Sequence, residues 1–438
     1  MIRKEALADI SPRPPRAPDG AALPRVREAH TLAACALVAA LAAGCGSPPA
    51  APAAPPRTLP PPADLIALPA PPAWTTALAQ PLTVSVAADG SVVAGSSPAD
   101  GRGDVAWAFA ASGVPVPLQT AAGGAVFALP GGLVVVGPGV ADPPGPAELV
   151  DIQGLPLWTG AAVGPISAVG AMGGLRLAIV DSGTASVTEL TSPAGGPAVA
   201  VAGQGLSGLA AGAAVQFDDQ GDALVVDAVQ ASLDAPSGTQ QWSVALTSST
   251  LPRSLALDRD GAGVTVATTG TDNTLYQFAA LPGGRPSVSW SEPLASGGPN
   301  LLVPGPRGRV AVLGVGGGAT FAVYREQDGA LLWQDTVPPA GSGPSPTVTG
   351  LAFLPQGGAA VALSGCGAGG APCILEVDAH GAPLGRIPLP TGAQVTLAAD
   401  AAAAAVLVPP AQSAGPSTLE WINLPARPAA PPAASGPS

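Results

Sequence analysis

The chain repeats a hairpin whose second strand carries tryptophan, and this repeat constrains the fold more than any other feature. The segment AVYREQDGALLWQDTV at 322–337 predicts a strand, a turn at Asp328-Gly329 and a second strand with Trp333. Each copy has an apolar strand, a glycine-containing turn and a strand with tryptophan near its start. Related segments occur at 148–163, 231–246 and 275–294, with Trp158, Trp242 and Trp290 in the shared position.

A second hairpin precedes each tryptophan hairpin, so that one repeat holds four short strands. The first hairpins turn at glycines that recur every 40 to 50 residues: Gly90, Gly132, Gly174, Gly221, Gly261, Gly308 and Gly358. A period of this length with four strands is typical of a propeller blade. The pattern predicts an all-β fold, a single eight-bladed β-propeller of four-stranded blades over residues 71–425, with seven blades as the alternative.

The two ends of the repeat array are incomplete in complementary ways. The last repeat, which begins at Gln394, has only three strands and ends near Trp421. The segment PPAWTTAL at 71–78 matches the tryptophan strand of a repeat but has no repeat of its own. We therefore expect this N-terminal strand to close the last blade, which would tie the two ends of the ring together.

The N-terminal 70 residues do not match the repeat. The apolar run TLAACALVAALAA at 31–43 follows a basic segment and is too short to span a bilayer, which is typical of a signal peptide. We expect a signal peptide over 1–44, a Pro/Ala-rich tether over 45–70 and a disordered tail over 426–438.

The run ends in LAAGC, residues 41–45, which resembles the lipobox of bacterial lipoproteins. That resemblance implies cleavage before Cys45, acylation of Cys45 and a place in the bacterial cell envelope, at the outer membrane and facing the periplasm or the cell surface. The alternative is a soluble secreted protein.

The segment DIQGLPLW at 151–158 resembles the repeat of quinoprotein-like propellers, which are also described as PQQ-like or WD40-like repeats. The eight-bladed outer-membrane assembly lipoproteins share this repeat. The resemblance implies the fold and carries no activity by itself. Quinone-using members have adjacent cysteines, a calcium site and a catalytic carboxylate, none of which can be placed here, so we expect no cofactor.

Composition argues against several classes of function. The formal net charge is −12 and Lys4 is the only lysine, which disfavours nucleic acid as a partner and excludes a Schiff-base lysine from residues 45–438. Only two histidines occur, His30 and His380, too few for a histidine-rich metal site or a conventional triad. We predict a non-catalytic protein-binding or scaffold module without a metal site; the alternative is an enzyme or lectin acting on a small molecule or sugar at the central channel.

Two cysteines remain after the signal segment and Cys45. Cys366 and Cys373 flank the short segment GAGGAP between two strands of the seventh repeat. Because a cell envelope is oxidising and no other metal ligands lie nearby in the sequence, we predict a disulfide between them.

The predicted loops differ in length between the two ends of the blades. Turns within hairpins are short, whereas the connections at the other end are long and rich in Pro and Gly. Length on one face indicates a variable, interacting surface. We therefore expect a monomer that binds a basic envelope protein through this face and contacts a membrane only through its anchor; the acidic residues assigned to the face are Asp100, Asp142, Glu148, Asp272 and Glu292.

Overall fold

The fold is known from a computed structural model. By internal contacts the chain divides into Met1–Pro52 and Ala53–Ser438, and every described residue belongs to the second unit. The predicted signal peptide, Cys45 and the tail at 426–438 lie outside the described residues. The structure describes 56–79, 83–87, 89–95, 105–109, 113–119, 125–129, 131–138, 144–163, 166–171, 175–180, 185–191, 199–205, 213–217, 222–226, 230–235, 239–245, 252–257, 263–268, 274–279, 287–294, 301–314, 319–339, 345–354, 357–367, 370–398, 402–410 and 415–425.

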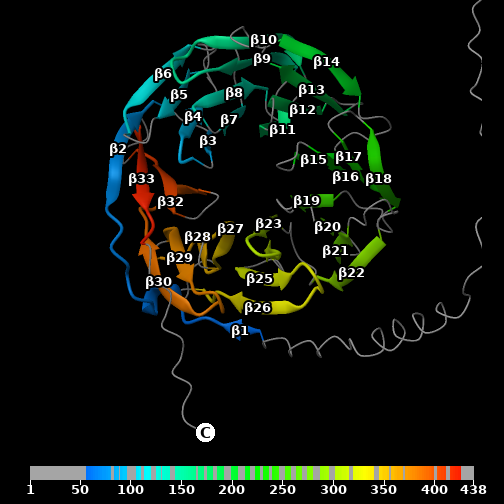
Figure 1. The fold of residues 1–438 in the computed structure, drawn as a ribbon. Coiled ribbons are helices and arrows are strands. Elements are labelled where there is room, and N and C mark those ends of the chain that lie inside the picture. Colours follow the sequence, from blue (N-terminus) through cyan, green and yellow to red (C-terminus); the bar gives the residue numbers. More distant parts are fainter. Residues whose placement is uncertain are drawn as a thin grey trace, which may run out of the picture. The chain divides into compact units, whose positions relative to one another are not determined.

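The described strands pair into eight sheets, numbered here in chain order (Figure 1). The first sheet is β3 (Thr83–Val86), β4 (Val92–Gly95), β5 (Val105–Phe109) and β6 (Pro115–Gln119). The second is β7 (Ala125–Leu129), β8 (Leu133–Gly137), β9 (Gly145–Val150) and β10 (Pro156–Val163). The third is β11 (Ile166–Ala171), β12 (Leu175–Val180), β13 (Ala185–Thr191) and β14 (Val199–Gly205). The fourth is β15 (Ala214–Phe217), β16 (Ala223–Val226), β17 (Gln230–Asp234) and β18 (Gln240–Ala245).

The remaining four sheets follow the same antiparallel order, and two of them recruit a strand from the N-terminal part of the chain. The fifth is β19 (Pro252–Leu257), β20 (Gly263–Thr268), β21 (Thr274–Ala279) and β22 (Ser287–Pro293). The sixth is β23 (Leu301–Gly305), β24 (Arg309–Leu313), β25 (Thr320–Arg325) and β26 (Leu331–Thr336), with β1 (Arg57–Thr58) added at its edge. The seventh is β27 (Thr347–Phe353), β28 (Ala359–Ser364), β29 (Cys373–Val377) and β30 (Pro383–Pro388). The eighth is β31 (Gln394–Leu397), β32 (Ala403–Val408), β33 (Ser417–Asn423) and β2 (Pro72–Leu78).

The first strand of each sheet packs against the first strand of the next. These contacts run β3–β7–β11–β15–β19–β23–β27–β31, and β31 in turn contacts β3. Figure 1 shows the sheets side by side around a centre, with the fourth strand of each on the outside. The architecture is therefore an all-β propeller, as the repeat predicts.

The predicted set of eight equivalent four-stranded blades needs correction. Among the side chains that the structure describes, strands buried along most of their length belong to six sheets. A blade core is thus established for six sheets, which matches neither the predicted eight blades nor the alternative of seven. The sixth sheet also has five strands instead of four, because β1 pairs in parallel with the open edge of β26.

The N-terminal strand closes the eighth sheet, and this prediction is confirmed. β2 pairs antiparallel with β33, and Trp74 lies opposite Trp421 in the register. Their rings stack with centroids 6.1 Å apart, and Trp74 also stacks on Phe109 of the first sheet at 5.4 Å. One tryptophan therefore joins the first sheet to the eighth.

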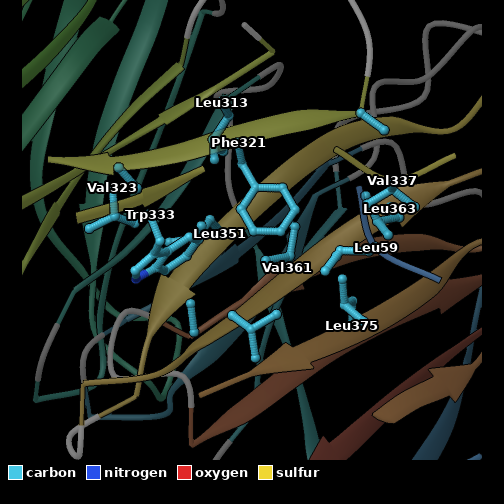
Figure 2. Close-up of a cluster of buried hydrophobic side chains, with 14 of the residues drawn as sticks. Leu59, Leu313, Phe321, Val323, Trp333, Val337, Leu351, Val361, Leu363 and Leu375 are labelled. Carbon is cyan, nitrogen blue, oxygen red and sulfur yellow. The ribbon is translucent and has the colours of Figure 1, made fainter. Parts of the chain in front are cut away.

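The cores between sheets are built mainly from valine, leucine and alanine, with a few aromatic rings. At the junction of the sixth and seventh sheets, Phe321 meets the edge of Trp333 at 5.7 Å, as Figure 2 shows. Leu351, Val361 and Leu375 of the seventh sheet lie in the same cluster. Other clusters, such as the one between the seventh and eighth sheets, contain only aliphatic side chains.

The predicted tether, residues 45–70, includes a C-terminal part that pairs with the sheets. Residues 57–70 follow the outer edges of the sixth and seventh sheets and lead into β2, as the blue segment in Figure 1 shows. This stretch includes the short 3-10 helix η1 (Pro62–Asp64). Leu59 and Leu68 are buried there, which explains why this part packs although its composition resembles a linker. We call residues 57–70 the strap.

Trp74→Ala should destabilise the ring at its closure, because Trp74 stacks on both Trp421 and Phe109. Loss of a large aromatic side chain from such a contact costs about 3 kcal/mol. Urea unfolding followed by circular dichroism measures the free energy of unfolding. Thr75→Ala, at an exposed position of the same strand, is the matched control. Equal stabilities of the two variants would contradict the closing role of Trp74.

Candidate functional site at the rim of the propeller

A tryptophan occupies one fixed position in the fourth strand of five sheets. In each case it pairs with the third strand next to a register shift, the mark of a β-bulge. A bulge inserts one extra residue and redirects the side chain that follows it. The predicted equivalence of the tryptophans is confirmed, and the strand with Trp74 joins the set: Trp74, Trp158, Trp242, Trp290 and Trp333.

Three of these rings cover a turn glycine of the next sheet around the ring. A Cβ on Gly113 would lie 2.2 Å from Trp74, one on Gly329 2.6 Å from Trp290, and one on Gly381 2.9 Å from Trp333. All three glycines have positive φ, between 69° and 79°, so both backbone and space require glycine. The tryptophans therefore join neighbouring sheets, which agrees with the predicted packing role.

The indole nitrogen can strengthen this junction. Trp290 Nε1 donates a hydrogen bond of 2.7 Å to the carbonyl oxygen of Glu326, in the turn that contains Gly329. The indole ring of Trp290 and its N–H group thus contact the same turn.

In the seventh sheet, Gly385 stands where five other sheets have tryptophan; the outer strands of the first and third sheets carry no tryptophan either. Gly385 pairs with Glu376 next to the same kind of register shift. A Cβ there would lie 2.7 Å from Cγ of Leu68, which belongs to the strap. Leu68 is buried in a cluster with Ile387 of the seventh sheet and Ile422 of the eighth. The strap therefore supplies the apolar side chain that the seventh sheet lacks.

Backbone hydrogen bonds fasten both ends of the strap. At its start, β1 pairs in parallel with β26, and Leu59 N donates to Thr336 O at 2.9 Å. At its end, Ala67 forms a parallel bridge with Arg386. Leu68 N donates to Arg386 O at 2.7 Å, and Arg386 N donates to Ile66 O at 2.9 Å.

An ion pair between the partly exposed Arg57 and the buried Asp335 completes the first attachment. Arg57 Nε donates to Asp335 Oδ1 at 3.0 Å and Arg57 Nη2 donates to Asp335 Oδ2 at 3.4 Å, while the Asp335 side chain is fully buried. Arg57 Nη2 also donates to the carbonyl oxygen of His380 at 2.5 Å. Two acceptors from two different sheets thus hold one guanidinium group.

The surroundings of Asp335 raise the pKa of its carboxyl group, although Arg57 opposes the rise. Burial raises the pKa of Asp335 to about 6, Arg57 acts in the lowering direction, and Asp378 adds a further rise. Asp378 is held in the neighbouring turn, where its Oδ1 accepts from the backbone N–H groups of His380 and Ala382, each at 2.8 Å. The loss of water around the ionised carboxylate is therefore the largest contribution to the raised pKa of Asp335.

The predicted partner-binding residues do not form one exposed group among the described residues. Asp100, Asp142 and Asp272 lie outside the described residues. Glu148 lies inside β9 and is buried, so its predicted place in an exposed loop is wrong; the loop ends earlier because β9 begins at Gly145.

Glu292 is exposed, but it belongs to β22 and pairs with Leu275 instead of lying in a loop. Its charge helps to raise the pKa of Tyr324 to about 12, after the larger effect of burial. Sequence reasoning missed the strap altogether, although Leu59, Leu65 and Leu68 were apolar exceptions in a Pro/Ala-rich segment.

The predicted disulfide is present. Cys366 and Cys373 are bonded, with Cα atoms 6.0 Å apart, and both residues are fully buried. The bond closes the connection between β28 and β29 at the junction with the sixth sheet. Within the described part of the chain, no group of three or more His, Cys, Asp or Glu side chains could hold a metal ion.

Comparison with known proteins supports the fold. No protein-family model matches the chain, and no curated protein matches it in sequence. The crystal structure of Chaetomium thermophilum Sqt1 aligns with a TM-score of 0.54 at 13% identity, covering 78% of this chain and 96% of that one. The beta-propeller domain of Myceliophteria thermophila Cps50 (Swd1) aligns with a TM-score of 0.47 at 13% identity, covering 67% of this chain and 96% of that domain. At this identity the likeness to Sqt1 shows the propeller fold alone.

In the described part of the chain, no helix has the length and apolar character needed to cross a bilayer.

Arg57→Ala should destabilise the protein by about 2 kcal/mol at pH 7.5, because it leaves an ionised carboxylate buried without its cation. At pH 5 the loss should be smaller, since Asp335 is then largely protonated. Urea unfolding at the two pH values measures the difference. A loss that is the same at both would contradict the ion pair.

The wild-type chain should gain stability from Asp335 as the pH falls. The folded-state pKa of about 6 lies above the ordinary value of 3.8, so the folded state takes up the proton first. Stability from this group therefore rises between pH 7.5 and 5 and levels off below the unfolded pKa. Asp335→Asn removes this part of the pH dependence; an unchanged pH profile in that variant would contradict the assignment.

Replacing both Cys366 and Cys373 by alanine should lower the free energy of unfolding by roughly 2–3 kcal/mol, the entropy expected for so short a loop. Because each sheet keeps its own hydrogen bonds, the ring should stay folded. Thermal unfolding followed by circular dichroism, with the reduced wild-type protein as a second sample, tests this. A variant that is unfolded at 25 °C would contradict the prediction.

Proposed function

We propose that this protein is a lipid-anchored, non-catalytic scaffold of the bacterial cell envelope that binds a protein partner, with repeats of the quinoprotein-like type. The single observation that carries the proposal is the strap, which fixes the N-terminal part of the chain along the rim of the ring. A chain attached at the rim leaves both turn faces of the propeller free for partners.

The position of the strap sets how far the body can stand from an anchor. Cys45, the acylation residue of the proposal, precedes Arg57 by twelve residues (57 − 45 = 12). At about 3.1 Å per residue in extended, proline-rich chain, this linker spans roughly 40 Å.

The rigidity of the rim suits a scaffold. Tryptophan rings pack on turn glycines at three junctions, and Leu68 of the strap packs beside Gly385 of the seventh sheet. A platform whose parts do not shift holds binding groups in place and loses little entropy when a partner docks. The fold alone assigns no activity, so the proposal rests on this geometry and on the sequence features of the N-terminus.

The proposed partner is a basic envelope protein. The chain carries a formal net charge of −12, which favours association with a cationic surface. We assign the contact to the acidic residues Asp100, Asp142, Asp272 and Glu292, and withdraw Glu148 because it is buried.

Cys45→Ser should move the protein from the membrane fraction to the soluble envelope fraction, because acylation of Cys45 is the proposed anchor. Fractionation with immunoblotting, together with mass spectrometry of the mature N-terminus, measures this. Wild-type protein that is already soluble with an unmodified N-terminus would contradict the anchor and favour a secreted protein.

A pull-down from envelope membranes tests the partner. Asp142→Lys combined with Asp272→Lys should reduce capture, and the remaining capture should fall further as salt is raised. Gln153→Lys, an exposed change of charge in a short turn, is the control. Equal capture by all three proteins would contradict the acidic surface.

A further inference from the structure

The strap is bound to the ring as an extended peptide would be. Its contacts are the ion pair of Arg57, the buried side chains of Leu59 and Leu68, and backbone hydrogen bonds to the edges of β26 and β30. Peptides that add to open sheet edges use the same combination of backbone bonds for affinity and side-chain pockets for specificity. We call the surface beneath it the seat: Asp335, His380, Gly381, Gly385 and Arg386.

The upstream half of the seat is built for arginine. The fully buried carboxylate of Asp335 takes two guanidinium nitrogens, and the His380 carbonyl takes one of them as well. A Cβ on Gly381 would lie 2.3 Å from Arg57 Nη2, so glycine makes the space for the group. Lysine cannot reproduce this planar, multidentate contact.

The downstream half is built for a leucine in extended chain. Gly385 leaves open the space that tryptophan fills in five other sheets, and Leu68 occupies it. Arg386 gives one backbone donor and one backbone acceptor to the strap, which fixes its direction as parallel. Ile66, between these contacts, is 73% exposed and contributes no buried side chain.

We propose that the seat is a peptide-binding site that the strap occupies in cis and that also accepts, in trans, an extended partner segment of the same chemistry. The ligand class is a peptide with arginine two residues before a leucine and a second leucine nine residues further on, the spacing of Arg57, Leu59 and Leu68. Because β1 is only the edge strand of the sixth sheet, its departure would leave the four strands β23–β26 paired with one another. The inference names a partner chemistry for the proposed scaffold but does not depend on the lipid anchor.

The test uses the full chain with its own strap weakened by Arg57→Ala and Leu68→Ala. The probe is a fluorescent peptide of residues 56–70, PRTLPPPADLIALPA, and binding is measured by fluorescence anisotropy. The weakened variant should bind the peptide at least tenfold more tightly than wild type, because the wild-type strap competes at high effective concentration. The peptide should also raise the melting temperature of the variant.

Matched peptides and variants check the two halves of the seat. The Arg57→Lys peptide should bind at least tenfold more weakly, whereas the Ile66→Ala peptide should bind like the parent. Adding Gly385→Ala to the weakened variant should reduce binding as well, since its Cβ would lie 2.7 Å from Leu68 Cγ. Arg57→Ala alone serves as the receptor if the double variant does not fold, as judged by circular dichroism.

Three results would overturn the proposal: no saturable binding at millimolar peptide, equal binding of the arginine and lysine peptides, or equal binding by wild type and weakened variant. None of these bears on the membrane fractionation or on the envelope pull-down, so failure here is distinct from failure of the scaffold function.

Discussion

The antiparallel pairing of β2 with β33 is the constraint on which the rest of the structure depends. Without it the last sheet would have three strands, and the junction between the first and eighth sheets would lose Trp74. The pairing joins residues about 340 positions apart in the sequence, so closure links the two ends of the array and removes an open end that could fray. It also fixes the place where the strap leaves the ring, because the strap runs directly into β2.

The contact between an outer-strand tryptophan and a turn glycine of the next sheet repeats around the rim. The seventh sheet, which has no tryptophan at this position, is the most informative case. In the seventh sheet the position is Gly385, and the missing volume is filled by Leu68 from a segment that precedes the whole ring in sequence. The outer strands of the first and third sheets also carry no tryptophan, but in the seventh sheet a side chain from the strap takes the free place beside Gly385. That contact turns an apparent linker into part of the fold.

Much of the architecture was predictable from residue order because it rests on local chemistry. Turn glycines at a regular period and alternating apolar strands specify hairpins, and neighbouring hairpins specify sheets. The complementary defects at the two ends predicted the pairing near Trp421, and the short spacing of Cys366 and Cys373 predicted their bond. The candidate site was not predictable, since the partners of Arg57 lie 278 and 323 residues away, and nothing near Arg57 distinguishes it from a linker residue.

The sequence by itself determined the class of fold and the tryptophan positions, because both depend on periodicity. It also indicated the closing strand, because the last repeat lacks one strand and the segment at 71–78 matches a repeat strand without a repeat of its own. Only the tertiary structure decided that residues 57–70 pack along the rim, that Glu148 is buried in a strand, and that Asp335 needs a cation from the far end of the chain. These outcomes depend on which edges lie open and which side chains lose water when the ring forms. Composition cannot reveal that, since the free energy of burying a group depends on neighbours that only the folded chain brings together.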